Sequence, residues 1–272
     1  MFNVAWVRRE LETLGIPPLK RLGQHFLVDI LIRDRLVESA GLSRDDLVIE
    51  VGPGLGFLTS KLAAGAGRVI AVEKDRTLAA YLRRKFANVE NVTVVQGDAL
   101  KTVVPENAKI VSSPPYNISS KLILLILDSG FSVAALLLQA EFVERLTASS
   151  GSRDYGRLSI MFQSRAHARL VEVVPKTAFY PKPKVDSAIV TIQPSKDIGL
   201  KNKELFEDMV RALFTQRRRR LSGVLARYLK TRFPAQEKEI RARIQIPEKR
   251  VFETTVEELA TLSDDLSAYL VE

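Results

Sequence analysis

The sequence predicts an α/β fold with a parallel sheet covered by helices on both faces, followed by a small basic helical domain. Between residues 46 and 139, short β-branched runs alternate with helical stretches. These runs are apolar almost throughout, as expected of strands buried on both faces. Residues 196–250 instead hold sixteen Lys or Arg against seven Asp or Glu, with helical spacing. We therefore expect two domains, 1–194 with an N-terminal arm and 195–272.

Each element of the first domain has its own local signal. Strands are expected at residues 47–51, 68–73, 92–96, 109–112 and 133–138. Helices are expected at 29–39, 57–64 and 78–86, after an arm of about 25 residues. Two later extended runs, 168–174 and 187–193, flank the proline-rich turn 180–184. They predict a hairpin added to the edge of the sheet.

Composition excludes several classes of protein. The 272 residues contain no cysteine and only two histidines, His25 and His167, so disulfides, thiolate chemistry and a histidine metal centre are not expected. No apolar run is long enough to span a bilayer, and the N-terminus lacks the pattern of a signal peptide. A cytoplasmic protein is therefore expected. Its formal net charge of +9 favours an anionic partner, most plausibly a nucleic acid.

The first chemical motif is a glycine-rich turn between a strand and a helix. Gly52, Gly54 and Gly56 follow the strand that contains Glu50, and glycine allows a tight turn and close approach of a ligand. Glu73 ends the next strand, where a carboxylate accepts hydrogen bonds from the hydroxyl groups of a ribose. The alternative is a plain tight turn with a solvated Glu73. The spacing differs from the dinucleotide fingerprint and resembles the S-adenosylmethionine loop of Rossmann-like methyltransferases.

Two further strand ends carry polar or rigid motifs. Asp98 follows the third strand, where it either accepts from the adenine amino group of the same cofactor or only caps a turn. Ser113-Pro114-Pro115-Tyr116 follows the fourth strand. The prolines hold a rigid turn with outward carbonyl groups, which suits an exocyclic amine, while Tyr116 provides a stacking surface. This tetrapeptide resembles the signature of enzymes that methylate amino groups of adenine or cytosine.

The order of all the motifs resembles one family, the ribosomal RNA adenine N6,N6-dimethyltransferases. The resemblance covers roughly residues 20 to 225. The motifs that carry it are Gln24-His25-Phe26-Leu27, Glu50 to Gly56, Gly97-Asp98-Ala99, Tyr116 to Ser119, Asp154-Tyr155-Gly156, Phe179 to Ser187 and Arg217 to Leu221. The first and the sixth are the specific ones, because other methyltransferases lack them.

The resemblance implies a role for each matching residue. Cofactor binding is implied for His25, Leu27, Gly52, Gly54, Glu73, Asp98 and Ser113. The catalytic motif would be Ser113, Pro114, Pro115 and Tyr116, and the target base would contact Tyr116 and Phe179. The family usually has Asn and Leu where this chain has Ser113 and Pro114, which puts the direct contact of Ser113 with the target amine in doubt. His25 has an alternative as a packed, hydrogen-bonded side chain that touches the cofactor only through its backbone.

The resemblance also implies substrate and partners. The reaction would be double methylation of N6 on two adjacent adenosines in the loop of the 3'-terminal hairpin of 16S rRNA, within a pre-ribosomal 30S particle. A monomer that uses S-adenosylmethionine and no metal is expected, with a role in small-subunit biogenesis. Arg217, Arg218 and Arg220 in the basic domain would contact RNA phosphates, although a solvated helix face is the simpler alternative.

Two other functions stay open at this stage. One is methylation of another nucleic acid, at adenine N6 or cytosine N4, because Ser-Pro-Pro-Tyr alone permits either. The other is a non-catalytic RNA-binding factor in ribosome assembly. The intact set of Gly52, Gly54, Gly56, Glu73 and Asp98 argues against a non-catalytic factor.

Overall fold

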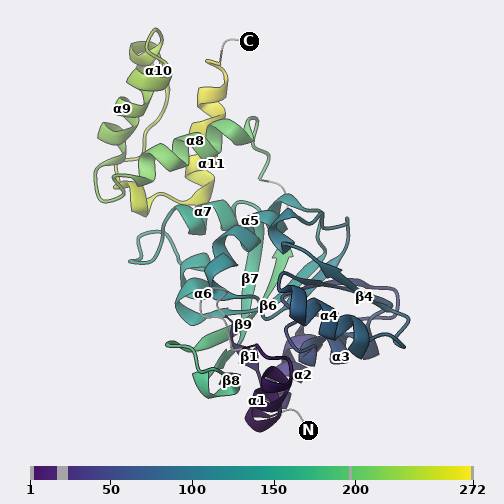
Figure 1. The fold of residues 1–272 in the computed structure, drawn as a ribbon. Coiled ribbons are helices and arrows are strands. Elements are labelled where there is room, and N and C mark those ends of the chain that lie inside the picture. The colour runs from purple at the N-terminus through teal and green to yellow at the C-terminus, as the bar shows by residue number, and fades with distance from the viewer. Residues whose placement is uncertain (1–2, 17–23, 196–197, 271–272) are drawn as a thin grey trace. The chain divides into compact units, whose positions relative to one another are not determined.

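The computed structural model describes residues 3–16, 24–195 and 198–270 (Figure 1). They form two compact units, of which unit 1 comprises residues 1–143 and 168–194, and unit 2 comprises 144–167 and 195–272. The two-domain prediction differs from this division in residues 144–167, which group with the C-terminal helices. The reason is packing: Tyr155, Ile160 and Met161 are buried in one cluster with the helices of unit 2.

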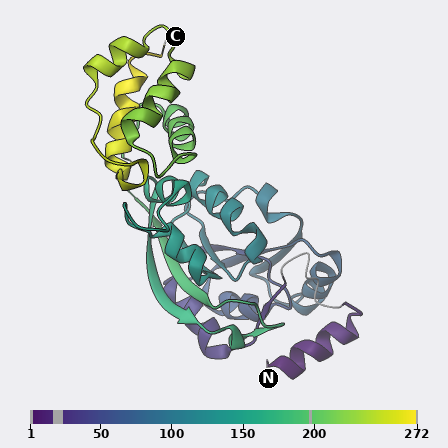
Figure 2. The ribbon, with the colours of Figure 1, turned by 90° about the vertical axis from the view of Figure 1, so that its left-hand side faces the viewer.

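A seven-stranded mixed sheet is the centre of unit 1, in the order β4-β3-β2-β5-β6-β9-β7. Its strands are β2 (Leu47–Val51), β3 (Arg68–Glu73), β4 (Val92–Gln96), β5 (Lys109–Ser112), β6 (Val133–Gln139), β7 (Ala166–Val174) and β9 (Ser187–Pro194). β2 to β6 are parallel, whereas β9 is antiparallel to β6. The expected strands are confirmed, and the predicted hairpin is β7 and β9, two long neighbouring strands at the edge (Figure 2).

Helices cover both faces of this sheet, as predicted. They are α2 (Ile30–Ser39), α3 (Phe57–Gly65), α4 (Arg76–Lys85) and α5 (Ser119–Asp128), and the chain continues after β6 into α6 (Ala140–Leu146). α2 and α3 bury Leu36 and Leu62 against Val48 and Val69 of the sheet. The connections through α3 and α4 lead from β2 toward β4, whereas the connection through α5 leads from β5 to β6, in the opposite direction along the sheet. Because such connections are right-handed, α5 lies on the other face of the sheet from α3 and α4.

The N-terminal arm differs from expectation because it contains a helix, α1 (Val4–Thr13). The side chain of Asn3 accepts a hydrogen bond from the backbone of Trp6 and begins the helix. Val7 and Leu11, one helical turn apart, are its buried residues. Residues 17–23 of the predicted arm lie outside the described residues. The chain then enters β1 (Phe26–Leu27), which pairs with β8 (Phe179–Tyr180).

Unit 2 is helical, as predicted for the basic segment. Its elements are α7 (Arg157–Gln163), α8 (Lys203–Phe214), α9 (Leu221–Arg232), α10 (Glu237–Arg243) and α11 (Val256–Ser267). Phe206, Leu225 and Leu259, from three of these helices, are buried in one apolar cluster. Short 3-10 turns also occur, one in unit 2 at Val251–Glu253 and three in unit 1 at Ala99–Lys101, Tyr116–Ile118 and Lys176–Ala178. Among the described residues, no helix is long and apolar enough to cross a membrane.

Candidate active site

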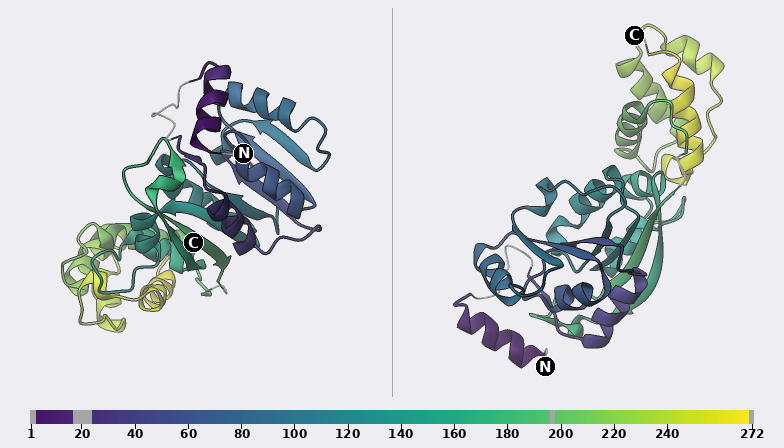
Figure 3. Two further views of the ribbon diagram at one scale, coloured as in Figure 1. Left: turned by 90° about the horizontal axis from the view of Figure 1, so that it is seen from below. Right: turned by 90° about the vertical axis from the view of Figure 1, so that its right-hand side faces the viewer.

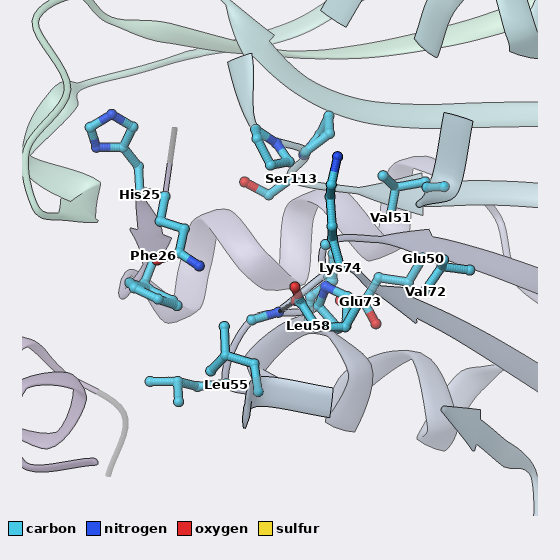
Figure 4. A pocket seen from close by; sticks show the side chains of 18 of the residues that line it. His25, Phe26, Glu50, Val51, Leu55, Leu58, Val72, Glu73, Lys74 and Ser113 are labelled. Atoms are coloured by element: carbon cyan, nitrogen blue, oxygen red, sulfur yellow. Dashed lines mark hydrogen bonds between the residues drawn. The ribbon is translucent and has the colours of Figure 1, made fainter. Parts of the chain in front are cut away.

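A pocket lies at the carboxyl ends of the parallel strands of unit 1. β3 and β4 extend the sheet to one side of β2, and β5 extends it to the other, so the pocket is at the point where the strand order reverses. Ten of the residues predicted from the sequence line it: His25, Leu27, Gly52, Gly54, Glu73, Asp98, Ser113, Pro114, Pro115 and Tyr116. In Figure 4, His25 and Phe26 lie on one side of the pocket, and Val51, Val72 and Glu73 lie on the other.

The glycine-rich turn lines this pocket, and its conformation leaves little room for side chains larger than glycine. Gly52 and Gly54 have φ values of +70° and +58°, a region that side chains disfavour. A Cβ on Gly54 would lie 3.0 Å from the ring of Phe26, and one on Gly52 would lie 3.2 Å from Pro115. The two glycines therefore let the segments that contain Phe26 and Pro115 close over the turn.

Glu73 is held in a fixed orientation beside this turn. One carboxylate oxygen accepts from the backbone N–H of Gly54 at 3.1 Å and the other from that of Asp75 at 2.8 Å. Glu73 is only 6% exposed, and this burial raises its pKa while the two N–H donors oppose the rise. The backbone N–H of Lys74 is a third donor to this carboxylate, which has about four acceptor positions, so it is still able to accept from a hydroxyl group of a ligand.

Glu50 is a second carboxyl group in the wall of the pocket. It is 1% exposed, and its Oε2 atom has no hydrogen-bond partner among the described residues. Burial raises the pKa of Glu50 to about 8, and the nearby Glu73 carboxylate adds to the rise. An unpaired acceptor in a buried wall is costly, and it is the kind of group that a ligand carrying N–H or ammonium donors satisfies.

Asp98 lies at the end of β4, where it caps the turn that follows. It accepts from the backbone N–H of Leu100 at 3.1 Å and from the ammonium group of Lys74 at 2.9 Å. The hydrogen bond from Lys74 lowers the pKa of Asp98. Both readings of Asp98 from the sequence are therefore compatible, since it caps a turn and also lines the pocket. Lys74 was not foreseen as a neighbour, because the two residues lie on different strands.

The Ser-Pro-Pro-Tyr segment leaves β5 directly into the pocket. Ser112, the last residue of the strand, donates a hydrogen bond to the carbonyl of Val51 at 2.5 Å and ties the segment to β2. The hydroxyl group of Ser113 points into the pocket in Figure 4. Tyr116 begins a short 3-10 turn, and its hydroxyl group shares a hydrogen bond of 2.6 Å with that of Ser187 in β9.

An aromatic cluster holds Tyr116 in place. The ring of His25 stacks on it, with centroids 5.6 Å apart and planes at 25°, and Phe179 meets its edge at 6.5 Å. The Nδ1 atom of His25 donates to the carbonyl of Pro181 at 2.6 Å, because a carbonyl can only accept. The side chain of His25 is thus packed and hydrogen-bonded, as the simpler reading of the sequence had it, while the residue also lines the pocket.

Phe179 is not among the residues that line the pocket. It is 2% exposed and pairs with Leu27 in the short β1–β8 ladder. It is part of the apolar core of unit 1 and packs against the ring of Tyr116 in an edge-to-face arrangement. The predicted contact between Phe179 and a target base stays a prediction.

The predicted RNA-binding arginines lie in unit 2, in the segment between α8 and α9. The guanidinium group of Arg217 donates to the backbone carbonyls of Arg153 and Tyr155, the second at 2.8 Å. Arg218 and Arg220 are exposed and line a cleft in which basic residues outnumber acidic ones. Its other lining residues are Arg219, Lys249, Arg250, Glu248 and Glu253. Arg217 therefore differs from Arg218 and Arg220, because its guanidinium group already has hydrogen-bond partners inside unit 2, whereas the other two are exposed.

Several pocket residues were missed by the sequence analysis. They are Trp6, Val7, Leu55, Leu58, Lys74 and Leu78. Leu55, within the glycine-rich turn, could have been found from the motif. Trp6 and Val7 are far from any motif, and only the spacing of Val7 and Leu11 signals a helix with a buried face.

Comparisons with known proteins agree with this geometry. Residues 19–264 match the family model described as ribosomal RNA adenine dimethylase. The chain is 41% identical over 264 residues to a probable ribosomal RNA small subunit methyltransferase A of Pyrococcus abyssi, covering 96% of each chain. The corresponding protein of Thermococcus onnurineus is 43% identical over 266 residues, which cover 96% of this chain and 95% of that protein.

Two solved structures resemble the whole chain. A dimethyladenosine transferase from Plasmodium falciparum superposes with a TM-score of 0.80 at 27% identity, covering 90% of this chain and 98% of that one. The 23S rRNA methyltransferase ErmE superposes with a TM-score of 0.69 at 31% identity, covering 89% and 99%. The fold is thus that of the Rossmann-like methyltransferases, with a helical C-terminal part. This chain belongs to the ribosomal RNA adenine dimethylase family.

Proposed function

We propose that this protein transfers methyl groups from S-adenosylmethionine to N6 of two adjacent adenosines in the loop of the 3'-terminal hairpin of 16S rRNA. One observation carries the proposal: a single pocket joins the glycine-rich turn and Glu73 to the Ser-Pro-Pro-Tyr segment. The first two suit a nucleoside cofactor, and the third suits a base with an exocyclic amine. The names of the relatives, which refer to small-subunit rRNA methylation, support the same substrate.

The residues of the pocket fit S-adenosylmethionine. Glu73 would accept from the ribose hydroxyl groups, and Asp98 would accept from the adenine amino group. The unpaired, buried oxygen of Glu50 suits the ammonium group or the positive charge of the cofactor. When bound, S-adenosylmethionine supplies a methyl group on a positively charged sulfur. The lack of side chains at Gly52 and Gly54, which both line the pocket, would let the cofactor approach the backbone of the turn.

The chain's own residues would hold and orient the amine. The lone pair of adenine N6 is delocalised into the ring, which makes the free amine a poor nucleophile. Hydrogen bonds from the amine to the hydroxyl oxygen of Ser113 and to the carbonyl of Pro114 would localise that lone pair toward the methyl group. Tyr116, held by His25 and Ser187, would stack on the base and fix its plane.

The target adenosine must leave its stack to reach such a pocket. This costs least in a single-stranded loop, which favours a hairpin loop as the site of methylation. Unit 2 supports the same substrate, because exposed Arg218 and Arg220 lie next to Arg250 in one basic cleft. We propose that these residues contact RNA phosphates and that Arg217 holds the segment in place.

The setting proposed for the reaction is a pre-ribosomal 30S particle in the cytoplasm, with the protein acting as a monomer in small-subunit biogenesis. The naming of the relatives for small-subunit rRNA and the net charge of +9 support the ribosomal partner in this proposal. No metal is assigned a role. Among the described residues, no group of three or more His, Cys, Asp or Glu side chains is placed to hold one.

The test is incubation with labelled S-adenosylmethionine and small-subunit particles that lack the modification, followed by mapping of the methylated nucleosides. N6,N6-dimethyladenosine at two adjacent positions of the hairpin loop is the expected product. Label in N4-methylcytosine or in large-subunit RNA would replace the proposed substrate by one of the other methyltransferase functions. Tight particle binding without transfer of label would favour the non-catalytic assembly factor.

A further inference from the structure

The N-terminal helix α1 packs against the wall of the pocket in unit 1. Trp6 and Val7 line the pocket, next to Leu55 of the glycine-rich turn and Leu78 of α4. Figure 3 shows α1 alongside α4. The family model begins at residue 19, so α1 lies outside the part of the chain that it matches.

Apolar packing fixes which face of α1 meets the pocket. Val7 and Leu11 are 1% and 4% exposed and form one cluster with Leu55 and Leu78. Arg9, on the same helix, is exposed. Trp6 and Val7 are therefore held against the pocket wall by neighbours that do not themselves depend on a ligand.

Lys85 of α4 joins the helix to the glycine-rich turn. Its ammonium group donates to the carbonyl of Leu55 at 2.7 Å and lies 5.3 Å from the centre of the Trp6 ring and 5.7 Å from that of Tyr81. A cation over an aromatic ring is attracted to it, most strongly when both are partly buried. A movement of the turn on ligand binding would therefore shift the ammonium group of Lys85 relative to the ring of Trp6.

We propose that Trp6 and Val7 of α1 are part of the S-adenosylmethionine site, where they cover the nucleoside end of the cofactor and slow its release. This inference rests on the proposed function. Trp6 and Val7 pack in one cluster with Leu55. Leu55 is the neighbour of Gly54, whose backbone N–H donates to the Glu73 carboxylate that is proposed to bind the ribose. An indole ring offers a large, rigid apolar surface with little loss of conformational freedom on binding.

Trp6 also provides the measurement, because it is the single tryptophan in the sequence. S-adenosylhomocysteine serves as the probe, since it carries the same nucleoside and has no methyl group to transfer. Its binding should change the fluorescence of Trp6 with the same dissociation constant that calorimetry gives. It should also lower the quenching of Trp6 by acrylamide about twofold or more, as the ring becomes covered.

Three variants separate a contact from simple packing. Trp6→Leu should weaken the binding of S-adenosylhomocysteine about tenfold, mainly through faster release, because the aromatic surface is lost. Leu11→Ala should weaken it several-fold, because Leu11 anchors α1 without lining the pocket. Arg9→Ala, on the exposed face of α1, is the matched control and should leave binding unchanged.

The outcomes distinguish this inference from the proposed function. Calorimetric binding with unchanged Trp6 fluorescence and quenching, and with wild-type affinity in Trp6→Leu, would overturn the role of α1 and leave the methyltransferase proposal intact. Absence of calorimetric binding in the full chain would overturn both. The quenching measurement uses the unmodified protein, so it decides the question even if Trp6→Leu fails to fold.

Discussion

The buried carboxyl group of Glu50 should make the stability of unit 1 depend on pH. Glu50 is 1% exposed, and burial raises its pKa from the ordinary 4.5 to about 8. The folded protein therefore keeps a proton on Glu50 that the unfolded chain releases above pH 4.5. Because the folded state binds more protons between pH 4.5 and 8, the free energy of unfolding falls as the pH rises through this window.

The size of this fall follows from the two pKa values. Each tenfold difference in proton affinity is worth about 1.4 kcal/mol. With pKa values of 4.5 unfolded and about 8 folded, the loss that Glu50 causes between pH 5 and pH 8 is about 3.5 kcal/mol. Glu50→Gln replaces the carboxyl group by a neutral amide of similar shape and should abolish it. Lys85, whose pKa burial lowers to about 8, titrates in both proteins and largely cancels in the comparison.

The assay is urea unfolding at pH 5, 6, 7 and 8, followed by the fluorescence of Trp6, which reports on unit 1. The quantity compared is the change in the free energy of unfolding with pH in the wild type and in Glu50→Gln. Glu38→Gln is the control, since it makes the same chemical change at an exposed carboxylate. It should leave the pH dependence of the wild type unaltered.

Two results would refute this reasoning. If Glu50→Gln loses stability between pH 5 and pH 8 as steeply as the wild type, Glu50 is not the group that titrates. If the wild type gains stability over the same range, the carboxyl group is ionised in the folded protein. Glu50 would then have a stronger stabilising partner than Thr59 and Lys85, the two neighbours that favour its ionised form in the structure.

Four further outcomes are expected. Glu73→Ala should weaken the binding of S-adenosylmethionine by about 1–3 kcal/mol in calorimetry, through the loss of charged hydrogen bonds, and unchanged affinity would remove Glu73 from the site. Ser113→Ala should lower the rate of methyl transfer more than cofactor affinity, whereas Ser113→Asn should be tolerated; unchanged kinetics in the alanine variant would leave positioning to the backbone carbonyls. Replacing Arg218 and Arg220 by Gln should weaken RNA binding and flatten its salt dependence, with cofactor affinity unaltered, and a fall in both affinities would contradict the proposed role. Arg217→Gln should instead lower the melting temperature, because two backbone carbonyls lose their donor, and an unchanged melting temperature would free Arg217 for RNA.

Much of the sheet could be predicted from the sequence. The bounds of β2, β3, β4 and β5 coincide with the expected strands, and β6 is one residue longer than expected. β2, β3 and β5 are mostly buried and are nearly continuous apolar runs, whereas β4, at the edge of the sheet, is largely exposed and was indicated by its β-branched residues. A sharp turn needs glycine, so all of these signals are local. The pocket residues at the strand ends could also be predicted, because the carboxyl ends of parallel strands meet at one edge of the sheet.

The tertiary structure alone decided which distant segments meet. His25 stacks on Tyr116, Phe179 packs edge-to-face against the same ring, and Trp6 and Val7 of α1 line the pocket, although long stretches of sequence separate these residues. The sequence also placed Arg217 with its neighbours on RNA, whereas its donors reach carbonyls on a distant segment of unit 2. An apolar face or a charged group is visible in the sequence, but its partner depends on how the whole chain packs.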